Sequence, residues 1–138
     1  MPSFASLRTA VAAKLATVTQ LAYVYDHHAA NLEGYPACTF DVSDSSNEFL
    51  TNKDNLRTIT FKLVVYQETK VKGLDLATGI LDATVDAIIS AFENDFALAG
   101  AVDWCEPLNG PRNQLQTPNG IVIAQELSLK CFYSSAVT

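Results

Sequence analysis

The order of hydrophobic periodicities along this chain is the feature that most limits its fold. Two segments repeat apolar residues every three to four positions, which predicts amphipathic helices, and other segments alternate them, which predicts strands with one buried face. The order helix, three strands, helix, two strands predicts an α+β fold, a two-layer sandwich in which a mostly antiparallel sheet carries both helices on one face. The predicted helices are Phe4–Thr17 and Gly73–Asn94, and the predicted strands are Leu21–Tyr25, Ala37–Val42, Leu56–Gln67, Ala101–Glu106 and Ile121–Tyr133.

The long third strand, Leu56–Gln67, has two different faces. Its odd-numbered positions from Ile59 to Val65 are apolar, so this face is predicted to join the core. The even-numbered face places Val64 and Tyr66 among threonines and Lys62. A sheet face of such mixed character often meets another subunit, and we therefore expect an interface there.

Two polar segments are predicted as long loops. Ser43–Asn55 is rich in Ser, Asp and Asn. Pro107–Asn119 contains three prolines and one Asn-Gly turn signal, and a second, Asn119-Gly120, lies at its end. The first loop also carries Phe49 and Leu50. These two side chains either fold back onto the core, extend a hairpin, or anchor a partner, and the sequence leaves these alternatives open.

Length and composition point to one domain, residues 1–138, with one core. The chain has 138 residues and 49% of them are apolar, so no disulfide is needed for stability. Its net charge of −6 argues against sequence-specific DNA binding, which gains affinity from neutralising phosphates. Three widely spaced cysteines without a C-x-x-C pair are expected to be buried free thiols in a reducing compartment: Cys38, Cys105 and Cys131.

Targeting signals are weak. No apolar run approaches the ~20 residues that span a bilayer, so no membrane segment is expected. The first 25 residues lack acidic side chains, as organellar transit peptides do, but they also fit an ordinary domain helix, which is the favoured interpretation.

Charged residues form two groups. Asp75, Asp82, Asp86 and Glu93 are spaced so that they share one side of the second helix. This acidic stripe is either a solvated outer face or a surface that must stay negative, such as one lining a DNA passage. Basic residues gather around the third strand, either to protect a sheet edge or to meet the acidic stripe of a neighbouring subunit: Lys53, Arg57, Lys62, Lys70 and Lys72.

No residue pattern indicates catalysis. Adjacent His27 and His28 cannot both reach one metal from a regular strand, and no second ligand pair supports them. Cys38 lies close enough in sequence for a Cys–His pair, but no orienting group or oxyanion site accompanies it. We therefore expect no metal, no cofactor and no enzymatic activity.

The ordered pattern resembles the tail terminator (tail completion) proteins of long-tailed bacteriophages. The resemblance covers most of the chain through short motifs and is weakest in Pro107–Asn119. It rests on the Ala/Leu-rich helix Ser6–Leu15, the segment Val24–His27, Tyr35–Pro36 opening a strand, a long strand from Arg57 into Val64–Tyr66, and the second helix followed by a closing strand.

The resemblance implies a ring, commonly six-fold, that caps the tail tube, ends its polymerisation and accepts the head. The implied partners are further copies of the chain, the major tail tube protein and the head–tail connector protein, with DNA passing through without being specifically bound. The implied location is the head-proximal end of the virion tail, after assembly in the host cytoplasm. Alternatives are a head-completion or connector protein at the same junction, a small α+β ligand-binding or enzyme subunit, and a non-viral scaffold domain. The candidate interface residues are Phe49, Leu50, Arg57, Lys62, Val64 and Tyr66.

Overall fold

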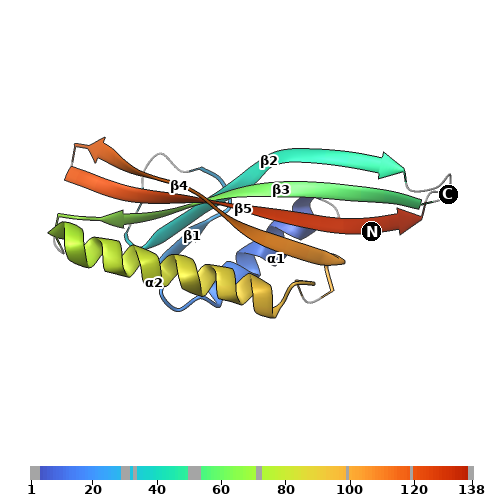
Figure 1. Cartoon of the computed structure of the whole chain (residues 1–138), viewed down its shortest axis with the longest axis horizontal. Helices are drawn as coiled ribbons and strands as arrows, with labels where there is room; N and C mark the ends of the chain where they lie inside the picture. The colour runs from blue at the N-terminus through green and yellow to red at the C-terminus, as the bar shows by residue number, and fades with distance from the viewer. Residues whose placement is uncertain are drawn as a thin grey trace.

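The computed structural model describes residues 4–28, 32, 34–49, 54–70, 73–98, 100–118 and 120–136. The predicted element order is confirmed, and the fold is α+β with a mostly antiparallel mixed sheet (Figure 1). The elements are α1 (Phe4–Ala16), β1 (Tyr23–Tyr25), β2 (Ala37–Phe49), β3 (Asp54–Glu68), α2 (Gly73–Asn94), β4 (Trp104–Thr117) and β5 (Gly120–Ala136).

One five-stranded sheet forms the first layer, in the order β1-β2-β3-β5-β4. Only the β1–β2 pairing is parallel. Helix α2 packs across β3, β4 and β5, while α1 lies against α2 and β1. Figure 1 shows both helices on the same side of the sheet, as predicted, so the opposite side carries no helix in the described chain.

The core lies between the helices and the odd-numbered face of β3. Ile59, Phe61, Leu63 and Val65 are at most 2% exposed, as the alternation predicted. Each helix contributes one stripe of apolar side chains, which its 3.6-residue period places toward the sheet. Within the core, the rings of Phe40 and Phe61 pack edge to face, with their centroids 6.0 Å apart. The buried helical side chains are Leu7, Val11 and Leu15 of α1 and Ala77, Leu81, Thr84, Val85, Ile88 and Phe92 of α2.

The loop predicted for Ser43–Asn55 is wrong over most of its length. Strand β2 continues to Phe49 and β3 begins at Asp54, with paired residues from Asp44↔Thr60 to Phe49↔Asn55. The far ends of β2 and β3 form a hairpin arm that extends past the helices in Figure 1. Ser43–Ser46 are exposed on this arm, so these positions can be polar. Backbone pairing alone makes this segment a strand. Leu50 lies outside the described residues.

The loop predicted for Pro107–Asn119 is also wrong, because β4 runs from Trp104 to Thr117. Strand β4 is at the edge of the sheet, where a proline can sit without removing a ladder hydrogen bond. The first Asn-Gly pair, Asn109-Gly110, does not form a turn between strands. It lies at a bulge in β4, between Asn109 and Arg112. Gly110 is required there, since a Cβ would lie 2.8 Å from the carbonyl oxygen of Glu126.

The core packing predicts the effect of one charged substitution. Leu81→Asp places an unpaired carboxylate at a fully buried position, and we expect it to lower the free energy of unfolding by on the order of 3 kcal/mol or more. Urea denaturation followed by circular dichroism measures this change. Leu76→Asp on the same helix is the matched control, because Leu76 is 64% exposed and should change stability by only about 0.5 kcal/mol. Equal stability of the two variants would contradict the packing.

Candidate functional site

The sheet face opposite the helices is the principal candidate site, and it is called the outer face below. Side chains alternate along each strand, so the inward position of Phe61 turns Lys62 and its even-numbered neighbours outward. Register then places Ser128 of β5 and Leu108 of β4 in the same row as Lys62. The outer face is therefore built from β2, β3, β5 and β4 together.

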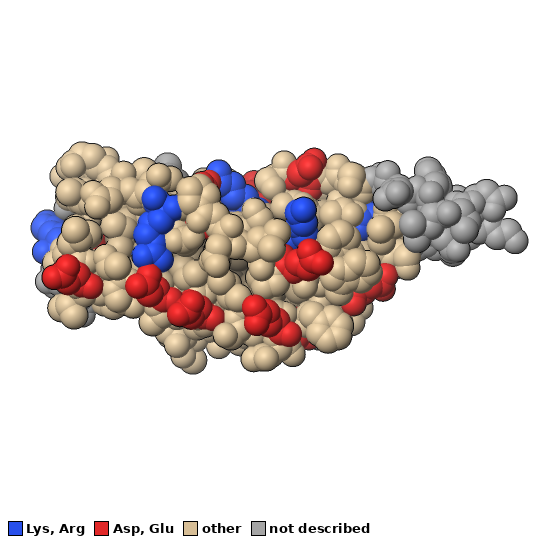
Figure 2. All heavy atoms as spheres, viewed as in Figure 1, with Lys and Arg blue, Asp and Glu red and all other residues tan. Residues whose placement is uncertain are grey.

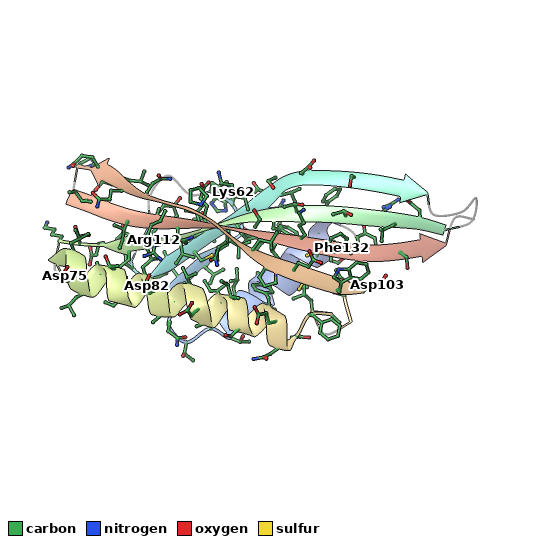
Figure 3. All side chains as sticks on the ribbon, viewed as in Figure 1. Lys62, Asp75, Asp82, Asp103, Arg112 and Phe132 are labelled. Carbon is green, nitrogen blue, oxygen red and sulfur yellow. The ribbon has the colours of Figure 1, made fainter. Side chains whose placement is uncertain are left out.

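Apolar side chains lie exposed on the β4 side of the outer face. Trp104, Leu108 and Leu115 are 38%, 44% and 42% exposed. Trp104 stacks on Phe132 of β5, with ring centroids 4.6 Å apart and planes 15° from parallel. Phe132 lies toward one end of the sheet, close to Asp103 in Figure 3. Exposed apolar groups on a sheet face that no described helix covers make this face a candidate contact surface.

A shallow hollow of about 260 Å³ lies in the outer face, and it brings three predicted interface residues together. Val64 is only 8% exposed, while the Lys62 ammonium pairs with the Glu126 carboxylate across neighbouring strands. Figure 3 shows Lys62 on the side of the sheet away from the helices. The lining residues are His28, Lys62, Val64, Tyr66, Asn113, Leu115, Ala124 and Glu126.

Arg57 and Phe49, two further predicted interface residues, lie elsewhere. Arg57 occupies an odd-numbered position of β3, opposite Tyr133, and so is on the helix-side face. Phe49 ends β2 at the tip of the hairpin arm. Lys53 and Lys72 are outside the described residues. Because Lys62 is already paired and Arg57 faces the opposite way, the described basic residues do not form one patch that could meet an acidic stripe.

The acidic stripe of α2 is present as predicted. Figure 2 shows a row of carboxylates along this helix at the lower edge of the molecule, and all four acidic residues are exposed. Asp82 Oδ1 lies 2.7 Å from Arg112 Nη1 of β4, and this ion pair joins the helix to the edge strand (Figure 3). No described basic side chain pairs with Asp75, Asp86 or Glu93. The stripe lies on the helix layer and is separate from the outer face.

The histidines and Cys38 do not assemble into a nucleophilic site. His28 Nδ1 lies 3.0 Å from Thr39 Oγ1, and neighbouring residues of a strand point to opposite faces, so His28 and Cys38 lie on opposite sides of β2. His27 is exposed beside Asp26, with 3.1 Å between Nδ1 and Oδ1. Within the described ranges, no three His, Cys, Asp or Glu side chains gather as a metal site would require.

The comparison with protein-family models finds no match for this chain, and the comparison with curated proteins finds none either. Among the described helices, neither is both long and apolar enough to cross a membrane.

The sequence predicted some residues of the outer face and missed others. Lys62, Val64 and Tyr66 followed from the alternation in β3, whereas Leu108 and Leu115 were missed because they fall in the segment predicted as a loop.

The three cysteines are buried free thiols, as predicted, and this makes their reactivity testable. Burial raises the pKa of Cys38 and of Cys131 to about 12 and that of Cys105 to about 11. A raised pKa leaves almost no thiolate at pH 8, and the thiolate is the reactive form. We expect no thiol to react with a disulfide reagent such as DTNB in the folded protein at pH 8. All three should react in urea, and rapid reaction of any thiol in the folded state would contradict this burial.

Proposed function

We propose that this chain is a structural virion protein that forms a ring on the end of a phage tail tube, ends tube polymerisation and provides the interface for head attachment. The observation that carries the proposal is the outer face, which exposes Trp104, Leu108 and Leu115 without a covering layer among the described elements. A surface of this kind supports a role in contact between proteins. The bacteriophage family comes from the sequence resemblance described above.

The two faces of the molecule support a ring. One face is covered by α1 and α2, and the other is the bare outer face, so a contact that uses the outer face against a different surface of the next copy is heterologous. Heterologous contacts generate a ring when the rotation between copies closes. The six-fold number comes from the family resemblance. The major tail tube protein and the connector protein then contact the two sides of the ring.

Apolar contact is the better supported basis for this interface. The exposed residues on β4 bury apolar area when covered, at roughly 25 cal/mol per Å². Charge pairing between copies is less well supported, because Lys62 already pairs with Glu126 and Arg57 lies on the helix-side face. Phe49 at the end of β2, together with Leu50, which follows it in the sequence, remains a second proposed contact to the tail tube.

The acidic stripe of α2 fits a protein near DNA that does not bind it. Asp75, Asp86 and Glu93 have no described basic partner, and the chain carries a net charge of −6. Negative charge repels phosphates and gains nothing from counterion release, so DNA can pass without being held. The same stripe would serve a connector protein at the same junction, which is the alternative within this class.

A small-molecule site is less well supported. The hollow on the outer face holds about 260 Å³, which is below the ~300–1,000 Å³ of typical ligand pockets. It is open to solvent and formed from strand side chains that include an ion pair. A side chain of another protein fits such a hollow better than an enclosed ligand does.

Tail assembly with an outer-face variant tests the proposal. Leu108→Ser with Leu115→Ser removes two exposed apolar side chains from β4 and should leave the monomer folded. We expect a loss of ring formation by mass photometry, and tails that are overlong or fail to join heads by electron microscopy. Overlong tails indicate a terminator, whereas tails of normal length that do not join heads indicate a connector.

The matched control is Leu74→Ser with Leu76→Ser, which makes the same chemical change at exposed positions of α2. Tails assembled with this control should have normal length and join heads. Normal assembly with the β4 variant would contradict the interface assignment. A parent protein that stays monomeric both alone and with tail tubes would contradict the proposed function itself.

A further inference from the structure

Among the described elements, strand β2 has a long free edge. Strand β1 has three residues and pairs only with Ala37–Thr39 of β2. Beyond Thr39 no described strand lies against this side of β2, although the strand continues to Phe49. A free edge of this length presents backbone N–H groups on which another chain can add a strand.

Two aspartates bind backbone N–H groups along this edge. The N–H of Val42 donates to Asp41 Oδ1 at 2.8 Å, and the N–H of Ser45 donates to Asp44 Oδ1 at 2.9 Å. An N–H that donates to the carboxylate of the preceding residue is turned away from β3, so these two amides belong to the free edge. They flank the bulge between Val42 and Asp44, which also interrupts the regular spacing of the edge.

A cation from the helix layer holds the first of these carboxylates. Arg8 of α1 donates to Asp41 Oδ1 at 2.8 Å and to the backbone oxygen of Asp26 at 2.7 Å. The Arg8 guanidinium and the Val42 N–H together hold the pKa of Asp41 below its ordinary value, which keeps the carboxylate charged. Asp41 is thereby fixed between the helix and the edge that it covers.

The opposite edge of the sheet is blocked by different means. Strand β4 carries Pro107 and Pro111, which have no N–H to offer, and a bulge between Asn109 and Arg112. Both long edges of the sheet therefore resist the addition of a strand. Such features are the known means by which natural sheets avoid edge-to-edge association.

We propose that Asp41 and Asp44 are edge caps that keep the free edge of β2 from pairing with a strand of another molecule. Their carboxylates occupy the donors that an incoming strand needs, and they place negative charge where its carbonyl oxygens would approach. This role does not depend on the proposed function. For a protein that assembles into a ring, it means that copies meet through faces and not through uncontrolled strand pairing.

The double variant Asp41→Ala with Asp44→Ala tests the caps. Sedimentation velocity should show association beginning at a protein concentration at least about tenfold lower than for the parent chain, since each charge-assisted hydrogen bond is worth about a factor of ten or more. Asp41→Asn with Asp44→Asn keeps an acceptor oxygen at each position and should associate at least several-fold less than the alanine variant. Lys14→Ala is a second control, because it removes an α1 cation that pairs with Asp95 and not with the edge.

Adding Ser45→Pro to the alanine variant identifies the mode of association. Proline removes the outward N–H of Ser45, which is one of the two uncapped donors, so association through the β2 edge should fall at least several-fold toward the parent level. Association that the proline leaves unchanged, or a folded alanine variant that associates no more than the parent, would overturn the proposal. Asp44→Ala alone provides the same test if the double variant does not fold, because the Asp44 side chain is exposed and Arg8 forms its ion pair with Asp41.

Discussion

The structure depends on the pairing of β3 along its whole length. Every residue from Asp54 to Glu68 has a partner on β5, and β2 pairs with β3 from Ala37↔Tyr66 to Phe49↔Asn55. Because the side-chain period of a strand is two residues, burying Phe61 under the helices fixes the opposite orientation of Lys62 and Tyr66. The division of the sheet into a core face and an outer face follows from this one strand.

This division assigns separate tasks to the surfaces of the molecule. The helix layer supplies the core, an acidic stripe and the exposed Leu74 and Leu76, while the outer face supplies its own exposed apolar side chains and a hollow. The edges of the sheet offer few free hydrogen-bond donors. Asp41 and Asp44 accept hydrogen bonds from edge N–H groups of β2, and the prolines of β4 have no N–H. The proposed ring uses the outer face, because no described helix covers the sheet there.

The sequence predicted well the helix and the strand that bury one face in the core. It missed how far the strands extend where few of their side chains are buried. Leu56–Gln67 and Gly73–Asn94 carry clear periods because the core selects apolar residues at every second or at every third to fourth position. Ser43–Phe49 and Pro107–Thr117 carry no such period, because the first extends past the helices and the second is a mostly exposed edge strand. Backbone pairing with β3 and β5 determines both, and a single sequence contains no direct signal for it.

The candidate site shows the same limit. Lys62, Val64 and Tyr66 were found because their strand alternates, and the same alternation places Arg57 on the opposite face. Trp104 was read as part of a strand, but its stacking on Phe132 depends on the β4–β5 register. Leu108 and Leu115 are separated by the bulge at Asn109–Arg112, which shifts the phase between them and hides the common face in the sequence.

Trp104 provides the most direct test of the central claim that the outer face is the assembly surface. It is the only tryptophan in the chain, it lies on this face, and it is 38% exposed in the single molecule. Fluorescence emission and acrylamide quenching of Trp104 can be compared between the dilute monomer and the protein assembled on tail tubes. We predict a blue-shifted emission and reduced quenching on assembly, because covering the outer face removes Trp104 from water. Assembly with unchanged emission and unchanged quenching would show that the outer face stays open to solvent and would contradict the claim.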